Sequence, residues 1–240
     1  MKIAVMGDIH GAAGPYRVAL DTARREGFDQ LLIIGDLLTY GVDPLDCLAL
    51  TREAIEKDKA VLVAGNHDQL YLDMDTERSA YFDALPDWIK ESVRWTWEKI
   101  AHDFPDTFDW QEQWSFGSLL VAHANPFGYG DWTYLRSDAE QQRAAAALAA
   151  KGYRHGLFGH THRSSHYTAA DAVEIYTIGS LGQPRDKQEP RPQWAMIEIT
   201  DGQFSLDLRY ISYDWQAHKD AIFSTSLSDG TKARLCGFYT

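Results

Sequence analysis

Five short motifs that carry aspartate, asparagine and histidine occur in order along this chain, and most directly follow an apolar run typical of a strand. They are Gly7-Asp8-Ile9-His10, Gly35-Asp36, Gly65-Asn66-His67-Asp68, His123, and Gly159-His160-Thr161-His162. Oxygen and imidazole ligands of this mix suit divalent metals such as Mn, Fe or Zn. A catalytic metal usually has about three protein ligands plus water, so the set is too large for one ion. It fits two ions that share a bridging group, an arrangement that activates water against phosphorus.

In this order the motifs resemble the pattern D-x-H, G-D, G-N-H-D/E, H and G-H-x-H of the calcineurin-like metallophosphoesterase superfamily. The match runs from Asp8 to His162, and a weaker resemblance continues to about Asp186. One such short pattern would be a weak signal because short patterns recur by chance, whereas all of them in order are specific. The resemblance implies a metal-dependent phosphoric ester hydrolase. It also implies an α/β fold, a four-layer α/β/β/α sandwich of two mixed sheets flanked by helices.

The resemblance also implies which residues bind metal. The first ion would be held by Asp8, His10 and His162, and the second by Asn66, His123 and His160. Asp36 would bridge both, because the two oxygens of a carboxylate can hold ions about 3.5–4 Å apart. A hydroxide would complete the bridge and serve as the nucleophile. Mn, Fe, Zn, Ni and Co all accept these ligands, and we favour Mn for an assay.

Two residues of the third motif are expected to be catalytic. In this superfamily the histidine that follows the asparagine points at the substrate, so His67 would protonate the leaving oxygen or stabilise the transition state. Asp68 is expected to hold the His67 ring and fix its tautomer. The other histidines match no motif, and we expect them at the surface or in the core. They are His102, His155, His166 and His218.

Two further segments resemble a bacterial and archaeal branch of uncharacterised phosphoesterases. Gly35–Gly41 with Pro44 has the form GD-x-x-x-YG-x-x-P, and Gly179–Asp186 has the form GS-x-GQPRD. Within the second segment, Arg185 is a candidate phosphate clamp, since a guanidinium matches phosphate oxygens bidentately. A structural ion pair with a nearby acid explains this arginine equally well.

The loop after His123 supplies weaker candidates for substrate contact, namely Asn125, Tyr129 and Tyr134. The fourth motif of the family is usually His-Gly, whereas this chain has Ala124 after the histidine. Alanine tolerates a positive φ less well than glycine, so we expect the local loop to differ.

One departure from the family bears on the substrate. The protein Ser/Thr phosphatase branch has an arginine in its second motif and a glutamate after G-N-H. This chain has Tyr40 and Asp68 at those places. The difference counts against protein phosphatase activity.

Hydrophobic periodicity predicts the elements that position these side chains. Strands are expected at Lys2–Met6, Gln30–Ile34, Ala60–Ala64, Leu119–Ala122, His155–Phe158, Val173–Ile178, Trp194–Thr200 and, after an Asp201-Gly202 hairpin turn, Gln203–Ile211. Helices are expected at Pro15–Glu26, from an Asp43 N-cap to about Lys57, at Pro86–Phe104 and Ser137–Lys151, and from about Trp215 before an irregular tail. The β-α-β-α-β order of the first half implies a parallel sheet, whose carboxyl ends carry the first three motifs.

Residues 70–115 interrupt this alternation and hold a cluster of tryptophans. They are Trp88, Trp95, Trp97, Trp110 and Trp114. We expect one domain over residues 1–240, with a helical, cap-like insertion at about 70–115 beside or over the site. For most of the tryptophans ordinary core packing is the preferred explanation. An interface with a partner chain is another, and the oligomeric state stays open.

Composition limits the choice of partners. No apolar run approaches the roughly 18 residues that span a bilayer, so no membrane contact is expected. A cleaved signal peptide would remove Asp8, and Cys47 and Cys236 lie outside every motif, which favours a reduced, cytoplasmic protein. The net charge of −12 repels polyanions and makes nucleic acid a poor partner, whereas a small phosphorylated substrate fits.

The sequence therefore predicts a dimetal-dependent phosphoesterase that hydrolyses a small, nucleotide-like phosphomonoester or phosphodiester by attack of a metal-bridged hydroxide. It does not choose between the two esters, because specificity lies in the cap and loops. One alternative is a nuclease acting on single-stranded nucleic acid, which the acidic charge opposes. Another is a non-enzymatic scaffold that reuses the fold, as in the retromer subunit that resembles this family. The complete ligand set of this chain opposes that alternative.

Overall fold

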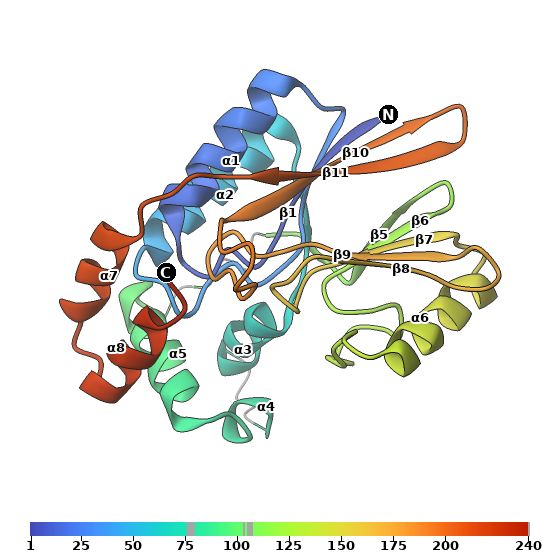
Figure 1. Ribbon diagram of the computed structural model, residues 1–240. Coiled ribbons are helices and arrows are strands. Elements are labelled where there is room, and N and C mark those ends of the chain that lie inside the picture. The colour runs from blue at the N-terminus through green and yellow to red at the C-terminus, as the bar shows by residue number, and fades with distance from the viewer. Residues whose placement is uncertain (76–79, 103, 105–107, 240) are drawn as a thin grey trace.

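Strands and helices alternate from the first strand, Lys2–Met6, to the helix Asn66–Asp75 (Figure 1). The computed structural model describes residues 1–75, 80–102, 104 and 108–239. Its strands are β1 (Lys2–Met6), β2 (Gln30–Ile33), β3 (Val61–Val63), β4 (Trp110–Gln111), β5 (Gln113–Phe116), β6 (Leu119–Ala122), β7 (His155–Phe158), β8 (Ser165–Thr168), β9 (Glu174–Thr177), β10 (Gln193–Thr200) and β11 (Gln203–Tyr210). Its helices are α1 (Ala13–Glu26), α2 (Pro44–Asp58), α3 (Asn66–Asp75), α4 (Ala80–Asp83), α5 (Asp87–Lys99), α6 (Asp138–Ala150), α7 (Gln216–Phe223) and α8 (Asp229–Cys236).

Two mixed sheets form the centre of the fold. One has six strands in the order β11-β10-β1-β2-β3-β4, and the other has five in the order β5-β6-β7-β9-β8. Strands β1 to β4 are parallel in the first sheet, and β6, β7 and β9 are parallel in the second. The carboxyl ends of parallel strands lie at one edge of each sheet, where open α/β sheets bind ligands.

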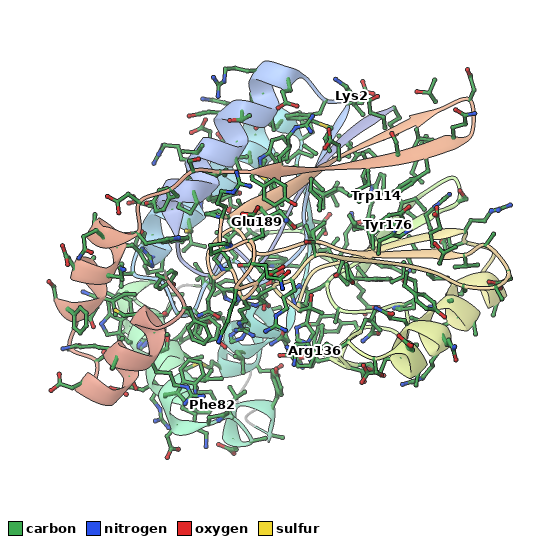
Figure 2. The ribbon with its side chains drawn as sticks, in the orientation of Figure 1. Lys2, Phe82, Trp114, Arg136, Tyr176 and Glu189 are labelled. Carbon is green, nitrogen blue, oxygen red and sulfur yellow. The ribbon has the colours of Figure 1, made fainter. Side chains whose placement is uncertain are left out.

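The sheets pack face to face, and helices cover their outer faces. Val5 and Leu32 of the first sheet meet Leu157 of the second, and all three side chains are fully buried. Figure 2 shows Trp114 and Tyr176 in the space between the sheets, where they pack against the same apolar cluster. Helices α1, α2 and α5 pack on the outer face of the first sheet and α6 on that of the second. The predicted four-layer α/β/β/α sandwich is confirmed.

Most of the predicted elements agree with the structure to within a few residues. The strands at Lys2–Met6 and His155–Phe158 have the predicted bounds, and Asp201-Gly202 joins β10 to β11 as a two-residue hairpin turn. Asp43 occupies the predicted N-cap position of α2. The Asp43 side chain makes no capping hydrogen bond, although Pro44 does occupy the first turn.

Elements without a strong apolar period escape prediction from the sequence. These are α3, α4, β4, β5, β8 and, in the tail expected to be irregular, α8. Strand β4 has two residues, and β5 and β8 are mostly exposed edge strands, so none has a buried run. Helix α8 is held by tertiary contact, since the Ser228 hydroxyl at its N-cap donates to the Glu91 carboxylate of α5 at 2.7 Å.

Helices α3, α4 and α5 occupy much of the stretch for which an insertion is predicted, and residues 76–79, 103 and 105–107 lie outside the described part. Helix α5 is shorter than the predicted Pro86–Phe104. The tryptophans at 88, 95, 97, 110 and 114 all pack against apolar clusters, so core packing accounts for them. The division of the chain into a domain with an inserted cap stays a prediction. None of the described helices is long and apolar enough to cross a membrane.

Candidate metal centre

The side chains of the motifs gather where carboxyl ends of parallel strands meet. Strand β1 precedes Asp8 and His10, β2 precedes Asp36, β3 precedes Asn66 and His67, β6 precedes His123, and β7 precedes His160 and His162. All of these residues are at most 6% exposed. Donor atoms of the carboxylates and of four histidines form two groups, and within each group all donor atoms lie within 4.8 Å of one another. The first group is Asp8, His10, Asp36 and His162. The second group is Asp36, His123 and His160.

Asp36 belongs to both groups and faces both through one oxygen. Its Oδ2 lies 3.6 Å from Nε2 of His10 and 3.5 Å from Nε2 of His123. Its Oδ1 accepts a hydrogen bond from the backbone N–H of His67 at 2.8 Å. Oδ2 therefore faces both groups, while Oδ1 is engaged by the His67 amide. The bridging role of Asp36 stays a prediction.

Asn66 joins the second group. Its Oδ1 lies 3.1 Å from Nε2 of His123, and its Nδ2 donates to the hydroxyl of Tyr81 at 3.0 Å. Because the tyrosine engages the amide nitrogen, the amide oxygen is the atom turned toward His123. An oxygen is also the donor that a divalent metal takes from an asparagine side chain.

Every histidine of the two groups donates one ring N–H to a backbone carbonyl. The bonds are His10 Nδ1 to Leu38 at 3.2 Å, His123 Nδ1 to Ile34 at 2.7 Å, His160 Nε2 to Trp132 at 3.0 Å, and His162 Nδ1 to Gln183 at 2.8 Å. A carbonyl oxygen only accepts, so the bonded nitrogen carries the hydrogen and the other nitrogen of a neutral ring presents a lone pair. Proteins orient metal-bound histidines in this way.

The converging lone pairs fit a cation. Nε2 of His10 lies 3.1 Å from Nε2 of His162, which lies 3.3 Å from Oδ1 of Asp8. Two imidazole nitrogens that both lack hydrogen repel each other at this distance, whereas a divalent cation beside them can bind both. Imidazole with carboxylate and amide oxygen is a donor set that Mn, Fe, Zn, Ni and Co accept.

The buried carboxylates make the centre attract positive charge. Burial raises the pKa of Asp8 to about 7. Burial opposes a charge on His123, but the carboxylates of Asp36 and Asp8 outweigh it and raise the pKa of this ring to about 10. Burial lowers the pKa of His160 to about 3, so that ring is neutral. Because metal ligands must be deprotonated, a cation that binds here displaces protons.

A left-handed backbone is common among these residues. The φ angles are 49° for Asp8, 47° for His10, 54° for Asp36, 62° for His160 and 56° for His162. Aspartate tolerates this region better than most residues, as does histidine, yet each such position costs of order 1–3 kcal/mol. Hydrogen bonds between loops hold the strained backbone, since the amides of Asp8 and His10 donate to the carbonyls of Gly35 and Asp36 at 3.1 and 2.9 Å.

His67 lies beside the centre with one ring nitrogen available. Its Nε2 lies 3.1 Å from the hydroxyl of Tyr40, and its buried Nδ1 has no hydrogen-bond partner among the described residues. Burial lowers the pKa of His67 to about 4, so the ring is neutral near pH 7. Its ring packs edge to face against that of His10, with centroids 5.1 Å apart. A buried unpartnered nitrogen at this place is available to a ligand.

Asp68 does not hold the His67 ring, contrary to the prediction. Its carboxylate accepts hydrogen bonds from the backbone N–H groups of Asp36 at 2.7 Å, Gly65 at 2.8 Å and Leu37 at 3.0 Å. The side chain turns back from α3 into the loops after β2 and β3, where these amides point inward. Asp68 therefore fixes the backbone that carries candidate ligands. It does not fix the tautomer of His67.

Arg185 lies beside the first group. Its backbone N–H donates to the carbonyl of His162 at 3.3 Å, and its guanidinium donates to Oε1 of Gln183 at 3.0 and 2.5 Å. Burial lowers the pKa of His162, and the charge of Arg185 lowers it further. Within the described part of the chain no carboxylate forms an ion pair with this guanidinium, so the ion-pair explanation has no support there.

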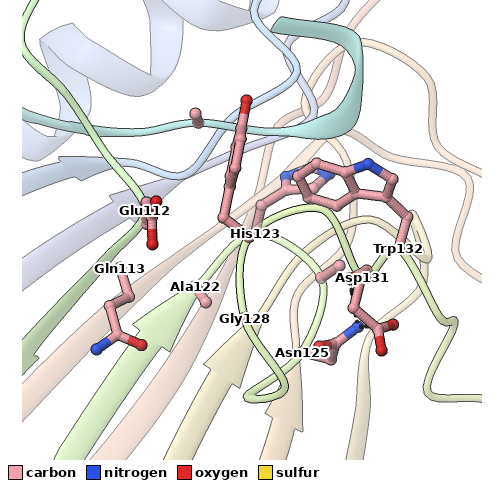
Figure 3. A pocket seen from close by; sticks show the side chains of 11 residues that line it. Glu112, Gln113, Ala122, His123, Asn125, Gly128, Asp131 and Trp132 are labelled. Atoms are coloured by element: carbon pink, nitrogen blue, oxygen red, sulfur yellow. Dashed lines mark hydrogen bonds between the residues drawn. The ribbon is translucent and has the colours of Figure 1, made fainter. Parts of the chain in front are cut away.

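A small cavity opens beside His123, and Asn125, Tyr129, Asp131 and Trp132 line it (Figure 3). Its volume of about 20 Å³ has room for about one water. Nδ2 of Asn125 donates to the carbonyl of Asp131 at 2.8 Å, so this side chain shapes its own loop. Tyr129 packs edge to face on Trp132 with centroids 5.3 Å apart. Neither contact brings the two predicted substrate-binding residues against a candidate ligand.

Other aromatic residues do touch the centre. Tyr134 stacks on His160 with ring centroids 4.1 Å apart, and Tyr40 packs on His10 at 4.7 Å. The sequence marks Tyr40 as part of the GD-x-x-x-YG-x-x-P pattern and as a departure from the phosphatase branch, and nothing in its spacing indicates a bond with His67. The backbone of Ala124 does not have a positive φ, so alanine fits at this position without strain.

The segment Gly179–Asp186 supports the first group from outside. The hydroxyl of Ser180 donates to the carbonyl of Asp8 at 2.6 Å, and the amide of Gly182 donates to the same carbonyl at 2.9 Å. A Cβ at Gly182 would lie 1.7 Å from the carbonyl oxygen of Ile9, which explains the glycine. The GS-x-GQPRD pattern identifies the segment, but only the fold brings it to the ligands.

Comparison with known proteins identifies the class. The chain matches the family model of calcineurin-like phosphoesterases over residues 1–164, and it belongs to this family. It is 25% identical over 245 residues to an uncharacterised protein of Methanocaldococcus jannaschii, a match that covers 97% of this chain and 96% of that protein. It is 32% identical over 146 residues to serine/threonine-protein phosphatase 1 of Salmonella typhimurium, covering 48% of this chain and 66% of that one.

A solved structure shares the fold. A hypothetical protein of Pyrococcus horikoshii superposes with a TM-score of 0.81 at 18% identity, covering 98% of this chain and 97% of that one. The family assignment makes the chain a hydrolase of phosphate esters, and the described Asp and His cluster could hold its metal.

Replacement of Gly65 tests how closely the ligands must approach the backbone. A Cβ there would lie 2.4 Å from Oδ1 of Asp36 and 2.9 Å from Nδ1 of His123, so Gly65→Ala must displace both side chains. We expect metal affinity at least tenfold weaker, measured by metal titration and elemental analysis. Gly230→Ala is the control, because nothing lies within 4 Å of its added Cβ. Normal metal affinity in a folded Gly65→Ala protein would contradict this account of the site.

Proposed function

We propose that this chain is a dimetal phosphoesterase that hydrolyses a small, nucleotide-like phosphomonoester or phosphodiester. The observation that carries the proposal is the pair of donor groups that share Asp36. The residues that would hold the first ion are Asp8, His10 and His162, and those for the second are Asn66, His123 and His160. Two bound cations would acidify a water and neutralise charge on the phosphoryl oxygens.

The protein groups around the ions would orient the substrate and serve the leaving oxygen. In hydrolysis the oxygen of water bonds to phosphorus, the ester P–O bond breaks, and the leaving oxygen takes a proton. Nδ1 of His67 is buried and has no hydrogen-bond partner among the described residues, which supports a hydrogen bond from this neutral ring to an ester oxygen. Arg185 has guanidinium hydrogens that Gln183 does not use, which supports a phosphate contact.

Small substrates fit better than the alternatives. The net charge of −12 opposes a nucleic-acid polyanion, because binding one depends on neutralising its phosphates. A scaffold role needs no converging ligands, yet both donor groups are present and buried. The contacts of the donor groups do not distinguish a monoester from a diester, since both chemistries use the same metal core.

The donor atoms bear on the choice of metal, and the two cysteines bear on the cellular compartment. We favour manganese in an assay because the donor set combines hard oxygens with imidazole. Cys47 and Cys236 are free thiols, which supports a cytoplasmic location, where thiols stay reduced.

Side-by-side hydrolysis of p-nitrophenyl phosphate and bis(p-nitrophenyl) phosphate tests the function. We expect turnover of at least one ester with Mn²⁺ and its loss with EDTA, because the carboxylates and imidazoles cannot activate water without a cation. The faster substrate identifies the ester class. Absence of metal-dependent turnover of either ester would refute the proposal for simple esters.

His67→Ala separates metal binding from chemistry. The ring lies beside the donor groups and is in neither of them, so the variant should retain its metal while its turnover falls about 10²–10⁴-fold. His166→Ala, which removes an exposed imidazole on β8, serves as the control. Loss of metal from the His67 variant would show that the assigned role is wrong.

Tyr40→Phe tests whether the hydroxyl positions His67. The substitution removes the hydrogen bond to His67 at 3.1 Å and the hydroxyl's interaction with the Arg185 side chain, and it leaves the ring contacts, so turnover should fall about 3–10-fold at unchanged metal content. Tyr210→Phe removes a hydroxyl from a more exposed position and should have no effect. In the His67→Ala background Tyr40→Phe should also have no effect, and an equal loss there would mean that Tyr40 acts independently.

A further inference from the structure

A cleft of about 580 Å³ opens between the segment after β9 and the C-terminal end of α8. We call it the arginine cleft, and its lining residues are Arg163, Pro184, Arg185, Asp186, Lys187, Pro190, Gly237 and Phe238. Its size is typical of small-molecule sites. The cavity beside His123, by contrast, holds about 20 Å³, which is room for about one water.

The arginine cleft adjoins the segment that carries His162 of the first donor group. Arg163 directly follows His162, and its Nε donates to the carbonyl of Arg185 at 3.0 Å. The backbone N–H of Arg185 in turn donates to the carbonyl of His162 at 3.3 Å. One wall of the cleft is therefore built from the backbone that carries a candidate metal ligand. A phosphate at the metal centre would lie beside this wall.

Positive charge gathers in this cleft, although the chain as a whole carries −12. Arg163, Arg185 and Lys187 supply three cations against the single carboxylate of Asp186. The Asp186 carboxylate accepts the backbone N–H of Gln188 at 2.9 Å. No ion pair of the described residues engages any of the three cations. Unpaired cations at a cleft attract and hold an anionic ligand.

The remaining walls are apolar. The ring of Phe238 is half-buried. Its centroid lies 5.3 Å from the guanidinium carbon of Arg185 and 6.2 Å from the ring centroid of Trp88. Pro184 and Pro190 add further apolar surface. A flat ring can stack on the open part of such a wall while charged groups contact the arginines and the lysine.

We propose that the arginine cleft binds the part of the substrate beyond the scissile phosphate, and that this part carries a second phosphate and an aromatic base. The inference rests on the proposed phosphoesterase function and names its substrate class, a nucleotide with at least two phosphate groups. Arg185 lies between the cleft and the metal centre and would contact phosphate oxygens on both sides. Lys187 and Arg163 would contact the second phosphate, and Phe238 the base.

Affinities of three hydrolysis-resistant probes for the manganese-loaded protein test this assignment. The probes are ribose 5-phosphorothioate, adenosine 5′-phosphorothioate and adenosine 5′-(α,β-methylene)diphosphate, which add first the base and then the second phosphate. Calorimetry at constant free Mn²⁺ should show about tenfold tighter binding for the diphosphate than for the monophosphate, as expected for charge-assisted contacts. Lys187→Glu should reduce this ratio at least fivefold, and Phe238→Ala should reduce the advantage of the base.

Lys57→Glu is the matched control, because it makes the same change in net charge at an exposed position of α2. It should leave both ratios unchanged. Equal affinities of the wild type for the monophosphate and the diphosphate would overturn the assignment. So would an equal effect of the Lys57 and Lys187 variants on the ratio of these two affinities. Turnover of the two p-nitrophenyl esters is measured in parallel. A protein that hydrolyses them but shows no preference for the second phosphate refutes the cleft assignment alone, whereas a protein without turnover refutes the function.

Discussion

The donated N–H of each histidine is the interaction on which the centre depends. Four backbone carbonyls, from the loops after β2 and β6 and the segment after β9, each accept one ring hydrogen. Because a carbonyl can only accept, the opposite nitrogen of each ring faces the centre, where it presents a lone pair once the ring is neutral. The carbonyls follow strands of both sheets, so the two sheets must be packed against each other before the rings can converge. Metal chemistry in this chain is thus a consequence of the sandwich.

The loops that carry these groups are held at a cost in backbone energy. Asp8, Asp36 and His162 have positive φ, which the surrounding structure must impose. Asp68 ties together the loops after β2 and β3 through three amides, and Ser180 holds the carbonyl of Asp8. These bonds are inside the protein and do not depend on a ligand. The same protein groups therefore hold the loops whether or not a metal or substrate is bound, which favours tight positioning of the reacting groups.

Prediction from the sequence succeeds where the residue types and their local spacing alone indicate a structure or a ligand. The buried runs at β1 and β7 define their strands, and the aspartates and histidines that follow them define the donor groups. It fails where a role depends on a distant partner. Asp68 adjoins His67 in sequence, yet its carboxylate accepts amides that come near only when β2 and β3 pair. Edge strands such as β8 and the C-terminal α8 lack a buried period, so their formation depends on tertiary contacts that the local sequence does not encode.

The two sides of the centre differ in a way that orients any substrate. On one side, the cavity beside His123 holds about 20 Å³, while Tyr134 stacks on His160 and the carbonyl of Trp132 accepts its ring N–H. On the side of His162, the arginine cleft stays open with about 580 Å³. Tyr40 stands between them, since its ring packs on His10 and its hydroxyl bonds His67. In the proposed function, the bulk of a phosphate ester would lie on the side of the arginine cleft, where the charge is opposite to that of the protein as a whole. Segments 162–163 and 183–185 carry residues of the cleft as well as the candidate ligand His162 and its hydrogen-bond acceptor Gln183. The proposed substrate contacts and the position of this candidate ligand would therefore depend on the same backbone.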